Sequence, residues 1–184
     1  MKKGAMSKEK ILQTGRILIR EEGWSAMNIR TVAALCGVSV GSIYNYFDSK
    51  AAFVGDVVES IWREIFHLSE GTDFSDTLAC VAWMYERMAE GDRRYPGFFT
   101  LHSLGFDGSE RSDGKMRMIG AWEHILAGLT AVIERDPRVR ADAWTEDFTP
   151  EIVANLLFSL MLSAVVRGDF DAKPVLELVC RTLY

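Results

Sequence analysis

The amino-acid sequence predicts an all-α protein, with a three-helix headpiece over residues 1–50 and a helical body over residues 51–184. Apolar residues recur at spacings of three and four along most of the chain, which is typical of helices with one buried face. No segment alternates apolar and polar residues over a useful strand length. With 184 residues and 48% hydrophobic content, the chain is long enough to bury a sizeable core.

The first helix is predicted over residues 8–22. Ser7 can cap its beginning, and Gly23 stops it. Gly15 lies in the middle of this helix, where it costs about 1 kcal/mol relative to alanine. Its presence therefore predicts that another helix packs closely at that point. The buried stripe of the helix is formed by Ile11, Leu12, Gly15, Leu18 and Ile19.

Residues 28–53 predict a helix-turn-helix. Asn28 can cap a helix that ends at Gly37, the residue type that best tolerates a left-handed backbone. A tight turn follows, and Ser39 can cap a second, very short helix whose Ile43 faces back toward the first. Two short helices that cross over a glycine-containing turn form the shape that enters a DNA major groove.

The body is predicted to begin with a helix over residues 50–68 that joins it to the headpiece. The polar segment 70–77 separates this helix from the next, which Ser75 or Asp76 can cap, and residues 105–114 are predicted to form a mobile surface loop. The further helices of the body are expected over residues 76–90, 97–104, 115–135, 150–167 and 171–183.

The predicted helix 150–167 has apolar residues on both sides, so it must be buried on two faces. Its second side carries small polar residues every fourth position, which let another helix approach closely. With a second apolar helix after it, the C-terminus predicts a four-helix bundle formed with another copy of the chain, a homodimer. The expected interface residues are Asn155, Ser159, Leu162, Ser163, Val166, Val175, Leu178 and Val179.

The charges of the chain are unevenly distributed. The net charge is -5, but residues 1–50 carry eight Lys and Arg against four Asp and Glu, and the remainder carries an excess of nine acidic residues. A basic headpiece on an acidic body turns one end of the molecule toward DNA. The chain opens with no signal-peptide pattern, and its longest apolar run, 152–166, is too short and too polar to span a bilayer, so a cytoplasmic location is expected.

Catalytic and metal-binding patterns are missing from the sequence. The three histidines are far apart, and none pairs with a cysteine or carboxylate at ligand spacing, so we expect neither a metal site nor a cofactor. Cys36, Cys80 and Cys180 are isolated and are expected to be reduced thiols packed as small apolar groups. Without a nucleophile motif or a phosphate loop, the chain is not expected to be an enzyme.

The headpiece resembles that of TetR-family transcriptional regulators. The similarity is carried by the order and spacing of Gly-Val-Ser-x-Gly-x-Ile-Tyr-x-Tyr-Phe-x-Ser-Lys at residues 37–50, and by Gly23-Trp24, Val32-Ala33 and Phe53 around it. Departures are mild, such as Asn28 and Cys36 where the family commonly has threonine and alanine. The resemblance covers the first 53 residues, and beyond them only the helical plan and the two closing helices are similar.

The resemblance implies a set of DNA contacts in the headpiece. Tyr44, Tyr46 and Lys50 would contact phosphates, and Asn45 can pair with an adenine edge. Arg30 and Thr31 would contact the backbone at the start of the preceding helix. An alternative is that the tyrosines only pack the headpiece and Lys50 is solvated. The full set of expected DNA-binding residues is Arg30, Thr31, Ser39, Val40, Gly41, Ser42, Tyr44, Asn45, Tyr46 and Lys50.

The aromatic and methionine content of the body suggests a pocket for an apolar small molecule, although an ordinary core is the alternative for each residue. His102 could bind a ligand there or be a satisfied core histidine, whereas His67 and His124 are expected at the surface or behind the site. The candidate ligand-binding residues are Trp62, Phe66, Trp83, Met84, Met88, Phe99, His102, Met118, Trp122 and Phe158.

These inferences together predict a DNA-binding transcriptional regulator. The favoured mechanism is a homodimeric repressor on a palindromic operator of double-stranded DNA, from which an unknown small apolar or amphipathic effector releases it. The alternative is an all-helical small-molecule carrier or enzyme in which the helix-turn-helix is only structural. The missing acid–base residues and the positive charge in the headpiece both favour the regulator.

Overall fold

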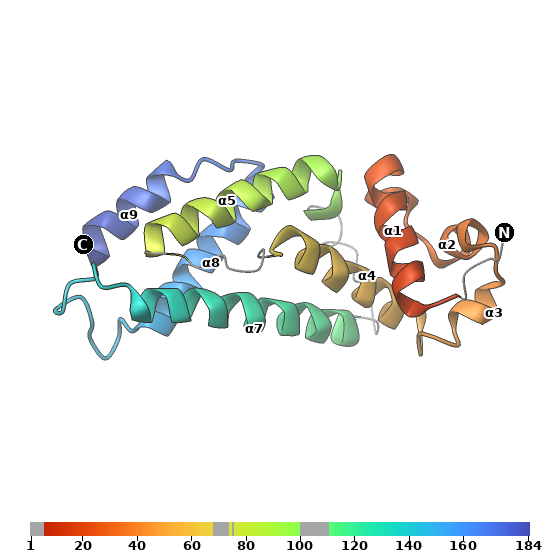
Figure 1. Ribbon diagram of the computed structural model, residues 1–184, viewed down its shortest axis with the longest axis horizontal. Coiled ribbons are helices and arrows are strands. Elements are labelled where there is room, and N and C mark those ends of the chain that lie inside the picture. Colours follow the sequence, from red (N-terminus) through yellow and green to blue (C-terminus); the bar gives the residue numbers. More distant parts are fainter. Residues whose placement is uncertain (1–5, 68–73, 75, 100–110) are drawn as a thin grey trace. The chain divides into compact units, whose positions relative to one another are not determined.

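The computed structural model describes residues 6–67, 74, 76–99 and 111–184, with side chains in the last range from Trp122 onward. Within these residues the chain is helical apart from its connections and one isolated backbone bridge between Thr145 and Phe148. The all-α prediction is therefore confirmed. The elements in chain order are α1 (Lys8–Glu22), η1 (Trp24–Ala26), α2 (Ile29–Cys36), α3 (Val40–Ile43), α4 (Lys50–Ile65), α5 (Thr77–Arg94), α7 (Arg111–Arg135), α8 (Pro150–Arg167) and α9 (Lys173–Leu183) (Figure 1).

The helices form two units. Unit 1 comprises Met1–Glu64 and Asp92–Ala121, and unit 2 comprises Ile65–Gly91 and Trp122–Tyr184. Three helices, α4, α5 and α7, begin in one unit and end in the other. The functional division into a DNA-binding part, 1–50, and an effector-binding and dimerisation part, 51–184, remains a prediction.

The predicted close approach at Gly15 is present in unit 1. A Cβ atom built at Gly15 would lie 3.2 Å from Cγ2 of Val57, a fully buried residue of α4. A larger side chain in α1 would therefore push α4 away. Packing of α1 against α4 outweighs the helix-propensity cost of this glycine.

An aromatic cluster completes the core of unit 1. Phe98 is fully buried, and its ring lies 5.7 Å from that of Trp24 and 6.0 Å from that of Trp62, both in edge-on arrangements. The backbone N–H of Trp24 also donates a 3.0 Å hydrogen bond to the Pro96 carbonyl. The segment that follows α5 is thereby held against α4 and against the turn after α1.

Helix α8 has the boundaries that the sequence predicts. Thr149 caps it, Pro150 opens it, and Gly168 ends it with a left-handed φ of 64°. One face is buried within unit 2. Among the described residues, α8 is the single helix long and apolar enough to cross a membrane by length and composition, with a mean hydropathy of 1.4 and 39% of its length buried. Core helices of soluble proteins meet the same two criteria.

Several predicted boundaries were wrong. Helix α4 ends at Ile65 and not at 68, α9 begins at Lys173 and not at 171, and α7 begins at Arg111, so that 111–114 is helical and not part of a loop. Helix α5 continues through Gly91 to Arg94, beyond its predicted end near residue 90. A Cβ atom at Gly91 would lie 2.7 Å from Cδ1 of Ile65, so the glycine lets α5 pack closely against this side chain. Most of the predicted helix 97–104 and of the predicted loop 105–114 lies outside the described residues.

Candidate DNA-binding surface and ligand cavity

The helix-turn-helix is built by local caps. The Asn28 side chain accepts a 2.9 Å hydrogen bond from the Thr31 backbone N–H and donates one of 2.7 Å to the Thr31 hydroxyl. Gly37 ends α2 with a left-handed φ of 69°, and Ser39 accepts a 3.1 Å bond from the Ser42 backbone N–H at the start of α3. All three caps are those that the sequence predicts. They leave α3 only four residues long and fix the turn that precedes it.

Apolar residues behind the helix-turn-helix orient its outer surface. Val32 of α2 and Ile43 of α3 are fully buried, and Phe47 is 3% exposed with its ring 5.2 Å from that of Phe53. With these side chains turned inward, most of the polar side chains of the motif face solvent. Arg30, Ser39, Gly41, Tyr44, Asn45, Tyr46 and Lys50 are exposed, whereas Thr31, Val40 and Ser42 are half-buried.

Gly41 leaves open space on this surface. Among the described residues, a Cβ atom built there would meet only the Ser39 hydroxyl oxygen, at 3.7 Å, so the fold of the unit does not itself require a glycine. Its φ is not in the left-handed region either. The missing side chain therefore gives another molecule close access to the backbone of α3.

The two exposed tyrosines differ in their surroundings. Tyr44 is 43% exposed, and its side chain lies on the surface. Tyr46 is 37% exposed, and its hydroxyl donates a 2.9 Å hydrogen bond to the Met6 carbonyl in the segment before α1. No local pattern in the sequence indicates this contact, because the two residues are 40 positions apart.

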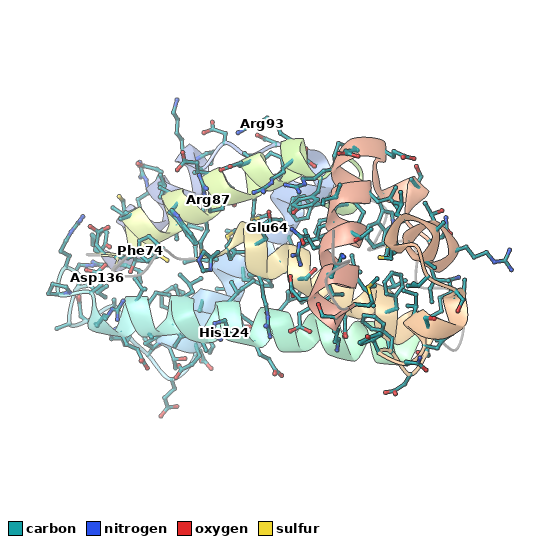
Figure 2. All side chains as sticks on the ribbon, turned by 45° about the vertical axis from the view of Figure 1, so that its right-hand side comes forward. Glu64, Phe74, Arg87, Arg93, His124 and Asp136 are labelled. Carbon is teal, nitrogen blue, oxygen red and sulfur yellow. The ribbon has the colours of Figure 1, made fainter. Side chains whose placement is uncertain are left out.

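Ion pairs connect α1 with α4 and α5 inside unit 1. Lys8 pairs with the buried Asp56 of α4 at 2.5 Å, and its ammonium also lies 5.2 Å from the centre of the Phe47 ring. Glu64, near the end of α4, binds Arg16 of α1 at 3.2 Å and Arg94 of α5 at 2.5 Å (Figure 2). None of these three pairs was predicted from the sequence, because no local spacing brings their members together.

Unit 2 contains a cavity of about 250 Å³. Three of the predicted ligand residues line it, namely Phe66, Trp83 and Met84. His124, which the sequence analysis placed at the surface or behind the site, lines it as well. The complete lining is Phe66, Phe74, Cys80, Trp83, Met84, His124, Ile125, Gly128, Leu129, Ala131, Val132 and Arg135.

Five of the other predicted ligand residues are described, and none of them lines this cavity. Trp62 and Phe99 are each 2% exposed and belong to the aromatic core of unit 1, with ring centres 5.4 Å apart. Met88 is 1% exposed in the core. Trp122 and Phe158 form an edge-on ring pair at 5.5 Å in unit 2, and neither is among the lining residues. His102 and the side chain of Met118 lie outside the described residues.

The cysteines are free thiols, as expected. Burial raises the pKa of the Cys80 thiol to about 12, and the nearby Arg135 opposes this rise only in part. The thiol is therefore neutral and unreactive at neutral pH. Among the described residues, no group of three His, Cys, Asp or Glu side chains is arranged to hold a metal ion.

The outer face of α8 carries exposed apolar side chains. Leu156 is 52% exposed and Val166 73%, and Leu178 of α9 is 46% exposed. Of the predicted interface residues, Asn155, Ser159 and Ser163 are exposed as well, and Leu162 and Val175 are half-buried. Val179 is a correction: at 1% exposure it packs in the core of its own chain, because it faces inward from α9.

Comparison with known proteins places the helix-turn-helix in a family. Residues 11–57 match the model of the bacterial regulatory proteins of the tetR family. This match covers α1 to the middle of α4, the part of unit 1 that holds the exposed surface described above. Over these residues the chain is similar to the helix-turn-helix of the tetR family of bacterial regulatory proteins.

Other comparisons extend the similarity over nearly the whole chain. The nucleoid occlusion factor SlmA of Salmonella typhi is 26% identical over 177 residues, covering 91% of this chain and 86% of that protein. The crystal structure of BioQ with its double-stranded DNA operator has a TM-score of 0.66 at 15% identity, covering 96% of this chain and 97% of BioQ.

A second solved structure leads to the same fold. A TetR-family transcriptional regulator from Agrobacterium tumefaciens has a TM-score of 0.61 at 22% identity, covering 96% of this chain and 97% of that one. The all-helical plan of a helix-turn-helix followed by a helical body is thus shared over the full chain. The family consists of DNA-binding transcription factors and not of enzymes, in agreement with the sequence analysis.

Proposed function

We propose that this TetR-family DNA-binding regulator acts as a homodimeric repressor that leaves a palindromic operator when a small apolar or amphipathic molecule occupies the cavity in unit 2. The observation that carries the proposal is the exposed surface around α3, where Gly41 opens the backbone and polar side chains stand beside it. Such a surface can both hold phosphates and read base edges.

The proposal assigns two kinds of contact to this surface. Tyr44, Tyr46 and Lys50 bind phosphate oxygens, because phenol hydroxyls and ammonium groups donate hydrogen bonds to them. Asn45 reads an adenine edge, and residues 39–42 lie against the bases. Arg30 and Thr31 hold the DNA backbone at the start of α2. Phosphate contacts fix the position of the protein, and base contacts select the sequence.

The homodimer is inferred from the exposed apolar faces of α8 and α9. Leu156 and Val166 of α8 and Leu178 of α9 are large apolar residues that are exposed in the monomer, and a second copy could cover them. The exposed Ser159 and Ser163 of α8 are small enough to let another helix approach closely. A twofold dimer places two headpieces about one helical turn of DNA, roughly 34 Å, or a small multiple of it apart. A palindromic operator follows from that symmetry.

Release by an effector is proposed as a population shift. The cavity is lined by residues of α5 and α7 and by Phe66, which directly follows α4, and these three helices each run through both units. A ligand that binds one arrangement of these helices more tightly than another shifts the protein toward that arrangement. The ratio of the ligand's affinities for the two arrangements sets the largest change in DNA affinity that the ligand can cause. A protein that acts on DNA in this way is expected in the cytoplasm.

The test is the affinity of the purified full-length protein for the promoter fragment beside its own gene, measured by fluorescence anisotropy across a salt series. If phosphate contacts carry binding, the logarithm of the affinity falls linearly with the logarithm of salt concentration, with a slope set by the number of phosphates bound. Affinity that does not change with salt would contradict the contact assignment. A protein that bound small molecules but no DNA at any salt concentration would favour the carrier.

A further inference from the structure

The cavity in unit 2 combines an apolar wall with a basic edge. Met84, Leu129 and Val132 of its wall are all at least 95% buried, and Trp83 adds a large half-buried ring. The ionisable side chains on its edge are Arg135 and His124, both exposed. No aspartate or glutamate is among the described residues that line it. The lining therefore suits a molecule with an apolar part and a negatively charged group.

The wall is shaped by aromatic rings. The ring of Trp83 lies 5.2 Å from that of Phe74 and 5.9 Å from that of Phe66, in tilted and edge-on arrangements. Rings at these angles present flat apolar faces against which an alkyl chain or an aromatic ring can lie. At about 250 Å³, the cavity is at the small end of the roughly 300–1,000 Å³ typical of ligand pockets, so its ligand is small.

The positive charge of Arg135 acts on the interior of the cavity. Arg135 opposes the rise of the pKa of Cys80, a lining residue that is 4% exposed, so its charge is felt at the buried wall. The neighbouring carboxylate of Asp136 accepts hydrogen bonds from the backbone N–H groups of Thr77 and Arg138 and from the Tyr184 hydroxyl. These three donors hold the Asp136 carboxylate beside Thr77, the first residue of α5. Figure 2 labels Asp136 together with the lining residues Phe74 and His124.

We propose that the cavity binds a small amphipathic anion, a medium-chain fatty acid or an aromatic carboxylate, with its acid group on Arg135 and its apolar part against Trp83 and Met84. A guanidinium can bind a carboxylate through two parallel hydrogen bonds, which fixes the direction of the ligand as well as its charge. His124 lines the cavity about three turns of α7 before Arg135, so it lies beside the apolar part of the ligand and not at the acid group. This assignment rests on the proposed effector role of the cavity and names the chemical class of that effector.

The experiment compares ligands that differ only in their polar group. Octanoate, 1-octanol and octylamine are titrated into the full-length protein by calorimetry below micelle-forming concentrations, and 2-naphthoate serves as the aromatic acid. We expect at least one acid to bind about tenfold or more tightly than 1-octanol and octylamine. Octylamine is the most demanding comparison, because the backbone carbonyls at the C-terminal end of α7 favour a cation over an anion.

Two arginine variants locate the acid group. Arg135→Ala is expected to weaken binding of the acid at least tenfold, and Arg135→Lys to recover part of the loss, because an ammonium keeps the charge but not the paired donors. Arg181→Ala is the matched control: it removes the same charge from an exposed arginine of unit 2 whose partner is Glu177 of α9. It should leave the affinity unchanged. Thermal unfolding of each variant checks that it is folded.

The outcomes separate the ligand class from the effector role. Failure of both acids to bind, tighter binding of 1-octanol or octylamine, or an unaltered affinity in Arg135→Ala overturns the anionic class. If 1-octanol nevertheless released the protein from DNA, the cavity would still be an effector site, but its effector would not be an anion. Conversely, if the acid binds through Arg135 but the affinity for DNA stays the same, the ligand class holds and the effector role fails.

Discussion

The Tyr46 hydroxyl donates its hydrogen bond to the Met6 carbonyl, at 2.9 Å, in the segment that precedes α1. A phenol has one proton to donate, so Tyr46 cannot give it to this carbonyl and to a phosphate at the same time. If Tyr46 binds DNA as proposed, the segment around Met6 must release it first. The observed Met6 carbonyl and the proposed phosphate therefore compete for the one hydroxyl proton of Tyr46. Removing that proton tests which partner matters.

Replacing Tyr46 with phenylalanine removes this proton and keeps the ring. We expect affinity for operator and random DNA to fall together by up to about tenfold, because a hydrogen bond to a charged group contributes about 1.5–3 kcal/mol and replaces a Met6 bond of about 0.5–1.5 kcal/mol. The loss of the exposed Met6 contact should lower the free energy of unfolding by only about 0.5–1.5 kcal/mol. Anisotropy and urea unfolding measure the two effects. Unchanged DNA affinity with reduced stability would mean that Tyr46 only ties down the chain before α1.

Lys50 and Asn45 are expected to contribute differently to DNA binding. Lys50→Ala should weaken binding to all sequences alike and reduce the salt slope by about 1 per headpiece, because a phosphate contact carries no sequence information. Asn45→Ala should cost about 1–3 kcal/mol on the operator and little on random DNA. Arg93→Ala, which removes one exposed positive charge from the last turn of α5, serves as the charge control. Equal losses on both DNAs for both variants would refute the division of roles.

Asp136 makes stability depend on pH in a defined direction. Burial raises the pKa of its carboxyl, but hydrogen bonds from Tyr184, Thr77 and Arg138 outweigh burial and hold the pKa below the ordinary value of 3.8. A lowered pKa in the folded state adds stability that is fully present well above pH 3.8 and is lost as the pH falls through the folded-state value.

Asp136→Asn tests this linkage. At pH 7 the variant should unfold with a free energy about 1–3 kcal/mol lower than the parent, since the buried donors lose a charged acceptor. The difference should shrink as the pH falls below about 4, where the parent carboxylate also takes up a proton. Urea unfolding of both proteins at several pH values measures it. A difference that stays constant from pH 7 to pH 3 would show that the charge of Asp136 does not contribute.

The contact of Gly91 with Ile65 predicts a non-additive pair of substitutions. Alanine at Gly91 gains about 1 kcal/mol of helix propensity, but its Cβ would lie 2.7 Å from Cδ1 of Ile65, and overpacking costs about 1–3 kcal/mol. Ile65→Val removes Cδ1, so the nearest remaining atom is Cγ1 at 3.0 Å and the overlap becomes smaller. We therefore expect the double variant to be more stable than the sum of the single effects predicts, by at least about 0.5 kcal/mol in a double-mutant cycle. Simple additivity would mean that the helices shift apart instead.

Local features of this fold could be predicted from the sequence because their causes are local. Asn28, Ser39 and Thr149 cap their helices through backbone groups only three residues away, so the residue type and its position are sufficient. Gly37 and Gly168 end helices by their own backbone angles. The close approach of another helix at Gly15 could be predicted for a related reason, because a glycine inside a helix is disfavoured unless a neighbour requires it.

Contacts between distant residues could not be predicted in the same way. Glu64 binds Arg16 and Arg94, and nothing in the spacing of these residues indicates that they meet. The periodicity of a helix shows which side is apolar but not which element covers it. Trp62 and Trp83 therefore had the same sequence signal, although one is in the core of unit 1 and the other lines the cavity of unit 2.

Val166 tests the proposed dimer, because its side chain is 73% exposed on the outer face of α8. In a dimer it would be buried, and an aspartate there would bring an unpaired charge into an apolar interface. Val166→Asp should therefore sediment as a monomer at micromolar concentration. Its affinity for a palindromic operator should also fall, because each headpiece then binds one half-site alone. Thr145→Asp, an exposed substitution in the connection between α7 and α8, should change neither property. A Val166→Asp protein that remained dimeric would place the interface on another face of the body.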